Sequence, residues 1–131
     1  MKGSKGRILL VEDHQDTLEI IHLSMQMLGY EVSSASTLAD AFILAGDGDF
    51  DLYLVDGKLP DGTGIEFCKQ IRKFDFKTPI LFCSASAYPY NIEEAMAAGA
   101  QDYLTKPVDL AILEQTISKL LRDNLGEMHA L

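Results

Sequence analysis

The sequence is poor in cysteine and in basic residues, and each shortage excludes a class of protein. Its 2 cysteines, Cys68 and Cys83, both lie in apolar runs, so we expect buried free thiols rather than a disulfide or a metal site. The 11 lysines and arginines are outnumbered by 20 acidic residues, which gives a formal net charge of -9. This charge argues against nonspecific binding to nucleic acid or to an anionic membrane, since both need an excess of basic residues.

Long apolar stretches are also missing. No stretch approaches the roughly 20 residues of a membrane span, and no long apolar segment follows the first lysines as it would in a signal peptide. Together with the unpaired cysteines, these absences predict a cytoplasmic protein without membrane or nucleic-acid partners. The composition that remains, with 47% hydrophobic and 24% charged residues over 131 positions, is typical of one globular domain with a substantial core.

Short apolar runs alternate with longer amphipathic stretches along the chain. Leu18, Ile21, Met25 and Leu28 recur at helical spacing, for example, and Gly29 ends that stretch. Such patterns predict strands at residues 8–11, 30–35, 52–55, 80–83 and 102–104, and helices at 16–28, 37–45, 64–74, 91–98 and from 109 onward, with a loop at 57–64. Strict alternation of five strands with five helices predicts a parallel sheet covered by helices on both faces.

Capping residues and apolar stripes define the last two helices. Asn91, with Glu94 at the right offset for a reciprocal bond, is predicted to cap the fourth helix. Asp109 is predicted to cap the fifth, and the residues of that helix predicted to face the core are Leu110, Leu113, Ile117, Leu120 and Leu121. We expect residues 1–6 to be flexible, residues 7–122 to form the domain, and residues 123–131 to extend the last helix or fray.

Polar residues follow the predicted strands at the point where each strand ends. In an open parallel sheet, ligands bind at the carboxyl ends of the strands, where the strand order reverses. The residues expected at this edge are Glu12 and Asp13 after the first strand, Asp56 after the third, Ser84 after the fourth, and Thr105, Lys106 and Pro107 after the fifth. Three carboxylates, a hydroxyl and an ammonium are therefore expected at one edge of the sheet.

Three acids at one edge raise one another's pKa, and a bound cation removes this cost. Oxygen ligands favour a hard ion such as Mg²⁺, and the sequence has no cluster of histidine and cysteine that would suit zinc. His14 follows Asp13 directly, but we interpret it as a residue of the first helix rather than as a metal ligand.

This ordered set of residues resembles the site of response-regulator receiver domains, and the resemblance extends over about residues 7–122. Pro60 and Gly64 in the loop after Asp56, and Tyr103 three residues before Lys106, are further matches. The resemblance implies a flavodoxin-like, doubly wound (βα)5 fold whose five-stranded parallel sheet has the strand order 2-1-3-4-5.

The resemblance also implies a role for each acidic residue. Asp56 is implied to be the phosphoacceptor, which takes a phosphoryl group from a phosphohistidine of a histidine kinase or of a histidine phosphotransfer protein. Asp13, Asp56 and the backbone carbonyl of Lys58 are implied to bind Mg²⁺ directly, and Glu12 is implied to act through a metal-bound water.

The remaining site residues are implied to sense the phosphoryl group. Lys106 would pair first with Asp56 and then with phosphoryl oxygens, and Ser84, where threonine is commoner in the family, would bind the phosphoryl group and shift when it arrives. Tyr103 would be the aromatic reporter that turns inward, and the Lys106–Pro107 peptide bond would be cis. The implied output is binding of a downstream protein target by the face of the fourth helix, fifth strand and fifth helix, as a monomer or as a phosphorylation-dependent dimer.

Two further sites carry expectations of their own. Lys58 and Ser86 flank the opening of the phosphoryl site in the family, so we predict that they tune dephosphorylation by controlling the attacking water. Tyr88 and Tyr90 follow the fourth strand, and either one of them packs in a turn or they form an exposed aromatic contact on the output face.

Three other functions are weighed against a phosphorylated switch. A degenerate receiver would serve as a constitutive interaction domain, although every expected site residue is present in this sequence. An aspartate-based phosphatase of the haloacid dehalogenase type resembles Asp-x-Asp at its nucleophile, whereas Asp56, Gly57 and Lys58 lack the second acid. A flavodoxin proper has a similar fold, but no hydroxyl-rich phosphate loop follows the first strand here.

Overall fold

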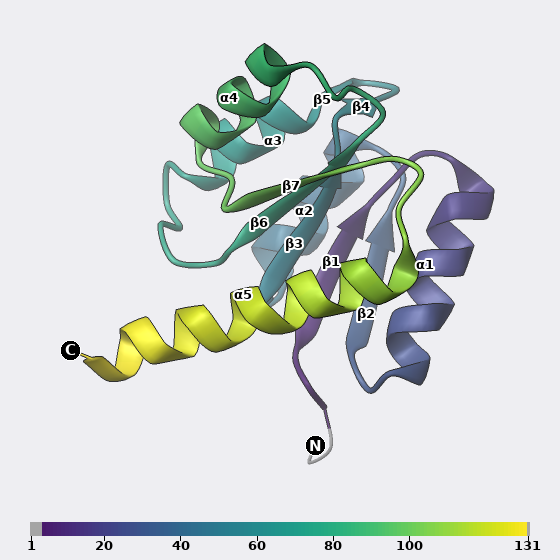
Figure 1. The fold of residues 1–131 in the computed structure, drawn as a ribbon. Helices are drawn as coiled ribbons and strands as arrows, with labels where there is room; N and C mark the ends of the chain where they lie inside the picture. Colours follow the sequence, from purple (N-terminus) through teal and green to yellow (C-terminus); the bar gives the residue numbers. More distant parts are fainter. Residues whose placement is uncertain (1–3, 131) are drawn as a thin grey trace.

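A parallel sheet with helices between its strands makes up the chain (Figure 1). The computed structural model describes the backbone of residues 4–130 and the side chains of residues 4–124. The sheet contains β1 (Arg7–Val11), β2 (Glu31–Ala35), β3 (Leu52–Asp56), β6 (Ile80–Ser84) and β7 (Asp102–Thr105). The helices are α1 (Gln15–Met27), α2 (Leu38–Asp47), α3 (Gly64–Ile71), α4 (Pro89–Ala98) and α5 (Leu110–Ala130).

The strand order of the sheet is β2-β1-β3-β6-β7, and every pairing in it is parallel. Counted over these five strands alone, this is the order 2-1-3-4-5, so the flavodoxin-like fold expected from the sequence is confirmed. The chain leaves β1 for β2 on one side and returns to β3 on the other. The strand order therefore reverses between β1 and β3, and a ligand site is expected at the carboxyl ends of these two strands.

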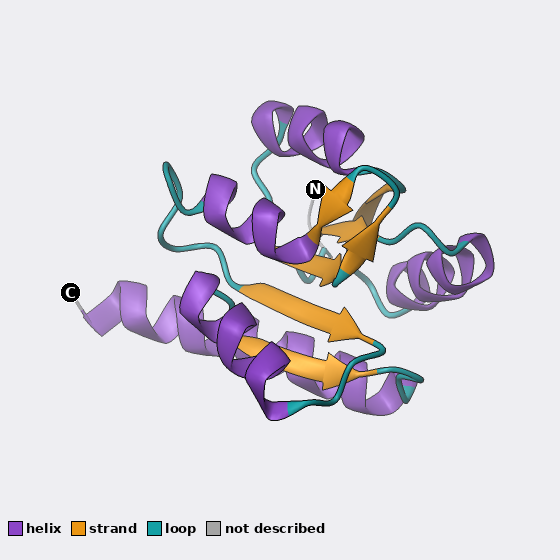
Figure 2. Cartoon of the chain, turned by 90° about the horizontal axis from the view of Figure 1, so that it is seen from above, coloured by secondary structure: helices purple, strands orange, loops and turns teal. Residues whose placement is uncertain are grey.

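Helices cover both faces of the sheet, as Figure 2 shows from above, and a separate hydrophobic core lies on each face. Successive strand residues point to opposite faces, so Leu9 packs with α2, α3 and α4, whereas Leu10 packs with α1 and α5. Cys68 and Cys83 are buried free thiols, as predicted, and burial raises the pKa of each to about 12.

The loop after β3 holds more structure than the sequence indicated. A short antiparallel hairpin, β4 (Lys58–Leu59) and β5 (Gly62–Thr63), occupies the segment predicted to be a loop. Thr63 and Glu66 form a reciprocal capping box at the start of α3, which matches a Thr-x-x-Glu signature in the sequence. The hairpin and the capping box fix the segment that directly follows Asp56.

Helix α3 ends at Ile71, three residues before the predicted end. The side chain of Arg72 donates to the backbone carbonyls of Asp75 and Gly99 and to the side chain of Gln101. These contacts join the end of α3 to the connection between α4 and β7. The contacts with Gly99 and Gln101 span 27 and 29 residues, so local periodicity could not reveal them.

The start of α4 also differs from the prediction. The helix begins at Pro89 with Tyr88 as its N-cap, which makes no side-chain capping bond, and Asn91 lies inside the first turn rather than capping it. Proline suits the first helical position because its missing N–H would have no partner there. Tyr88 and Tyr90 are both exposed and stack on each other with ring centroids 5.7 Å apart, so the expected packing of one tyrosine in a turn is wrong.

Helix α5 is capped at its start and packs into the core. Asp109 accepts hydrogen bonds from the backbone of Ala111 and Ile112, which confirms it as the cap of α5. Leu113, Ile117 and Leu120 are buried, but Leu110 is exposed against expectation. The helix continues through residue 130, and the segment from residue 123 extends it.

Of the segment expected to be flexible, residues 1–3 lie outside the described residues. Lys5 donates its backbone N–H to the carbonyl of Gly29, and the carbonyl of Gly6 accepts from Glu31.

Within the described residues, no helix is long and apolar enough to cross a bilayer.

Candidate functional site

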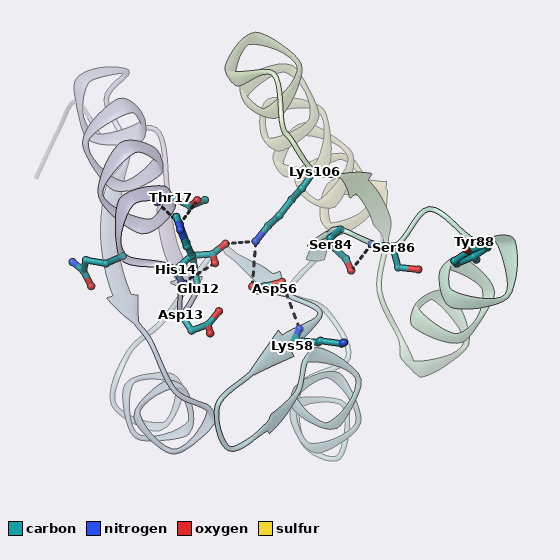
Figure 3. Close-up of a pocket in the computed structure, with 12 residues that line it drawn as sticks. Glu12, Asp13, His14, Thr17, Asp56, Lys58, Ser84, Ser86, Tyr88 and Lys106 are labelled. Atoms are coloured by element: carbon teal, nitrogen blue, oxygen red, sulfur yellow. Dashed lines mark hydrogen bonds and ion pairs between the residues drawn. The ribbon is translucent and has the colours of Figure 1, made fainter.

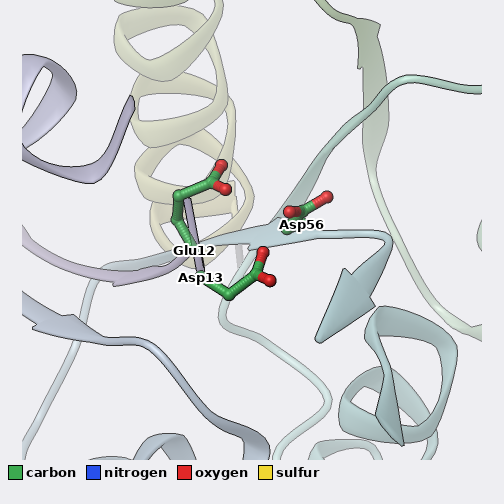
Figure 4. A group of neighbouring side chains, drawn as sticks. All are labelled: Glu12, Asp13 and Asp56. Carbon is green, nitrogen blue, oxygen red and sulfur yellow. The ribbon is translucent and has the colours of Figure 1, made fainter. Parts of the chain in front are cut away.

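Three carboxylates meet at the edge of the sheet where the strand order reverses. Glu12 and Asp13 follow β1 directly, and Asp56 ends β3, which pairs in register with β1. One carboxylate oxygen from each of the three lies within 4.8 Å of the others (Figure 4). An all-oxygen donor set of this size fits a hard divalent cation such as Mg²⁺, with the remaining positions open to water or phosphate oxygens.

The three acids differ in their exposure to solvent. Glu12 is 2% exposed, the side chain of Asp56 is 11% exposed, and Asp13 is exposed. Burial and, secondarily, the nearby charge of Glu12 raise the pKa of Asp56, although the ammonium of Lys106 opposes this shift. A second positive charge beside Asp56 would therefore favour its ionised form, which is the nucleophilic form.

Lys106 reaches across the site from the end of β7 and contacts two acids (Figure 3). Its Nζ lies 2.8 Å from Glu12 Oε1 and 3.2 Å from Asp56 Oδ2, so it pairs with the expected partner Asp56 and more closely with Glu12. Burial acts to lower the pKa of Lys106, but its bonds to the two carboxylates raise the pKa overall. The Lys106–Pro107 peptide bond is cis.

The hydroxyl of Ser84 lies across the site from Glu12, at the end of β6 (Figure 3). Its Oγ accepts from the backbone N–H of Ser86 at 3.3 Å. The backbone N–H of Lys58 points to Asp56 Oδ1 at 3.5 Å, which places the start of the hairpin beside the carboxylate. A cavity of about 820 Å³ lies over these groups, and it is large enough for a phosphoryl group with a hydrated cation.

Tyr103, on β7, lies inward over Phe82, with the two rings nearly parallel and their centroids 5.8 Å apart. Its hydroxyl donates to the backbone carbonyl of Ser86 at 2.7 Å. Hydrogen bonds through Ser86 therefore connect Tyr103, the expected aromatic reporter, with Ser84, the expected phosphoryl-binding hydroxyl.

Other contacts around the site were not apparent from the sequence. The side chain of Asp61 accepts from the backbone N–H groups of Leu38 and Ala39, which links the hairpin after β3 to the start of α2. These backbone bonds lower the pKa of Asp61. His14 caps α1 by accepting from the backbone of Thr17, which agrees with its interpretation as a helix residue. The position of Asp61 between Pro60 and Gly62 is typical of a turn, but its partner lies 23 residues away.

The fold is that of flavodoxin-like α/β proteins, and the acids and the lysine at its strand-order reversal define the receiver class within it. The chain belongs to the family described as the response regulator receiver domain, whose family model matches residues 8–118.

Similar proteins are bacterial regulators. The chain is 33% identical to the response regulator protein PilR of Pseudomonas aeruginosa over 91% of its own length and 27% of that protein. It is 37% identical to the transcriptional regulatory protein YvcP of Bacillus subtilis over 92% of its own length and 51% of that protein. The chain thus spans about a quarter to a half of the length of these relatives.

Solved structures agree on the fold. A CheY-like receiver domain of Methanospirillum hungatei superposes with a TM-score of 0.89 at 30% identity, covering 92% of this chain and 97% of that one. The chemotaxis response regulator CheY4 of Vibrio cholerae gives a TM-score of 0.80 at 31% identity, covering 87% and 97%. The protein is therefore a receiver domain of a two-component response regulator, a class of signalling domain.

Proposed function

We propose that the chain is a phosphorylated switch in which Asp56 accepts a phosphoryl group from the phosphohistidine of a histidine kinase or a histidine phosphotransfer protein. The observation that carries this proposal is the position of Asp56, whose carboxylate lies within 4.8 Å of the acids that follow β1 and 3.2 Å from the ammonium of Lys106. In the transfer, an oxygen of Asp56 forms a bond to phosphorus while the phosphorus–nitrogen bond breaks and its electron pair returns to the imidazole.

The residues around Asp56 suit the charge of a phosphoryl group. Asp13, Asp56 and the backbone carbonyl of Lys58 would hold Mg²⁺, and Glu12 would act through a bound water. The metal supplies neutralisation of charge on the phosphoryl oxygens, which is the main requirement of phosphoryl transfer. Lys106 supplies a second positive charge beside Asp56, and its ion pair with Glu12 already holds it there.

The proposed switch follows from the hydroxyl and the lysine. Lys106 would exchange its bond to Asp56 for bonds to the phosphoryl oxygens, and Ser84 would turn from the N–H of Ser86 to the phosphoryl group. Both residues adjoin the face of α4, β7 and α5, where the stacked Tyr88 and Tyr90 are exposed. Exposed aromatic residues are good interface anchors, so this face is proposed to control binding of a downstream protein.

The domain given by residues 7–122 is proposed to act in the cytoplasm as part of a signalling pathway, as a monomer or as a phosphorylation-dependent dimer. Its net charge of -9 favours protein partners over nucleic acid for this domain itself. The relatives PilR and YvcP are named as regulators, the latter of transcription, so a nucleic-acid partner of a longer protein would be bound elsewhere.

The proposal is tested by incubation with acetyl phosphate, with Mg²⁺ or with EDTA, followed by intact mass spectrometry. We expect one added phosphoryl group in the presence of Mg²⁺ and none with EDTA. Sustained turnover of p-nitrophenyl phosphate would indicate a phosphatase instead. The absence of an adduct under every condition would favour the degenerate receiver.

The acid cluster predicts that Mg²⁺ stabilises the fold. A cation that binds only the folded state at 100 times its Kd adds about 2.7 kcal/mol, or roughly 5–10 °C in Tm for a domain of this size. Differential scanning fluorimetry at constant ionic strength measures this shift. Asp13→Asn should reduce the shift strongly, and Asp16→Asn, an exposed acid in the first turn of α1, should leave it unchanged. An equal shift in both variants would mean that the cation binds elsewhere.

Lys58→Ala is expected to shorten the lifetime of the phosphorylated form. The Lys58 side chain is exposed at the rim of the cavity over Asp56, and its removal opens a path for the attacking water. We expect the half-life to fall about threefold, an effect of less than about 1 kcal/mol, as measured by the decay of the phosphorylated mass after removal of acetyl phosphate. Lys69→Ala, on the exposed side of α3, is the matched control. A half-life equal to that of the control would exclude this role.

A further inference from the structure

Ser86 makes three hydrogen bonds to three different parts of the molecule. Its backbone N–H donates to Ser84 Oγ at 3.3 Å, which Figure 3 shows, and its backbone carbonyl accepts from the Tyr103 hydroxyl at 2.7 Å. Its own hydroxyl donates to Oδ1 of Asn91, in the first turn of α4. One residue therefore contacts the hydroxyl of the phosphoryl site, the inward aromatic ring and a helix of the output face.

The hydrogen bond from Ser86 to Asn91 holds the start of α4, where the N-cap residue has no side-chain bond of its own. The N-cap residue Tyr88 makes no side-chain hydrogen bond. Among the described residues, the bond between Ser86 and Asn91 is the side-chain hydrogen bond that links the loop after β6 to this helix. Ser84, Ser86, Asn91 and Tyr103 also line one cavity of about 280 Å³ beside the acid cluster, so the four residues share a space in which side chains can shift.

We propose that Asn91 is a positioning residue, which joins helix α4 to Ser84 through Ser86. When the hydroxyl of Ser84 turns to a phosphoryl group, it releases the N–H of Ser86, and the loop is free to move. The hydrogen bond from Ser86 to Asn91 makes the first turn of α4 move with this loop. This inference rests on the proposed function, and it names Asn91 as the residue through which a shift of Ser84 moves helix α4.

Four variants separate this role from a general loss of structure. Asn91→Ala removes the acceptor, and Asn91→Asp keeps an oxygen acceptor of the same size for the Ser86 hydroxyl. Glu94→Gln is the matched control, because Glu94 lies one turn further along α4 and lines the same cavity without a hydrogen bond to Ser86. Ser86→Ala removes the donor, so it should have no additional effect in the Asn91→Ala background.

The first measurement is amide hydrogen exchange of residues 85–94 in the full chain without phosphorylation. Loss of one hydrogen bond should speed exchange about fivefold in Asn91→Ala, the factor that corresponds to about 1 kcal/mol. Asn91→Asp and Glu94→Gln should exchange like the wild type. Exchange in Asn91→Ala that equals that of Glu94→Gln would overturn the proposal, whether or not the protein accepts a phosphoryl group.

The second measurement repeats the exchange after incubation with acetyl phosphate and Mg²⁺, with intact mass recorded on the same samples. The wild type and Asn91→Asp should show a change in α4, whereas Asn91→Ala should carry the phosphoryl group and show at most a third of that change. A full change in phosphorylated Asn91→Ala would refute the inference while leaving the proposed function intact. Failure of the wild type to gain mass would instead refute the proposed function. The first measurement would still show whether the hydrogen bond from Ser86 to Asn91 holds the start of α4.

Discussion

Asp56→Asn is expected to abolish the mass increase from acetyl phosphate completely. The amide presents no carboxylate oxygen to attack phosphorus, and Asp56 is the proposed acceptor among the three acids of the site. The measurement is intact mass spectrometry after incubation with acetyl phosphate and Mg²⁺. Asp16→Asn makes the same chemical change at an exposed position in α1 and should be phosphorylated like the wild type. Full labelling of Asp56→Asn would place the acceptor elsewhere.

The same substitution should make the protein more stable in the absence of Mg²⁺. Burial and the charge of Glu12 raise the pKa of Asp56, so the folded state holds this proton more tightly than the unfolded state does. Stability therefore falls as pH rises from the ordinary carboxyl pKa through the raised one. An amide avoids this loss, and we expect a gain of about 1 kcal/mol, or roughly 3 °C in Tm.

A pH series separates this electrostatic effect from a simple packing change. The stability difference between Asp56→Asn and the wild type should grow as pH rises from about 3 to 7 in EDTA, and it should shrink when Mg²⁺ is added. Urea unfolding at each pH measures the difference. A difference that is constant over the whole pH range would contradict the raised pKa of Asp56.

Gly64→Ala is expected to cause the largest loss of stability. A Cβ at Gly64 would lie 2.4 Å from the backbone carbonyl oxygen of Asp56 and 2.9 Å from the ring of Phe82. The carbonyl belongs to the end of a central strand and cannot move without disturbing both the sheet and the site. We expect a loss of about 3 kcal/mol in the free energy of unfolding, at the upper end of ordinary overpacking costs, measured by urea denaturation.

Gly46→Ala is the matched control for that loss. Gly46 lies in the last turn of α2, and a Cβ there would meet no atom within 4 Å. Alanine is the better helix former, so this variant should be more stable by about 0.5 kcal/mol. Equal effects of the two substitutions would show that the contact with Asp56 does not determine the cost.

The sequence predicted the features that depend on local pattern. Continuous apolar runs such as Ile8 to Val11 indicated strands covered on both faces, and their alternation with amphipathic stretches gave the sheet and its two layers of helices. Because parallel strands end at the same edge, the residues after each strand could be assigned to one site. The structure brings Glu12, Asp13, Asp56 and Lys106 together there, as expected.

Features that depend on contacts distant in the sequence were not predictable in this way. Arg72, the C-cap of α3, bonds to Gly99, which lies beyond two further elements. Asn91 has the residue type and spacing of a cap, but Pro89 begins the helix earlier and Asn91 bonds to Ser86 instead. Prediction from local sequence assigns such residues a hydrogen-bond partner in the nearby backbone. In the folded chain they bond instead to residues of another segment.

The ion pairs of Lys106 also limit how a signal can leave the site. Three carboxylates and one ammonium leave the site with a formal charge of about two negative units, which a divalent cation cancels. An acyl phosphate carries about two negative charges where the carboxylate of Asp56 carried one. Phosphorylation would then change the total by about one charge, and salt screens that charge within roughly 8–10 Å. The electrostatic field of the site thus changes little at a distance. Phosphorylation must therefore act on the rest of the domain through the direct contacts that Lys106 and Ser84 make.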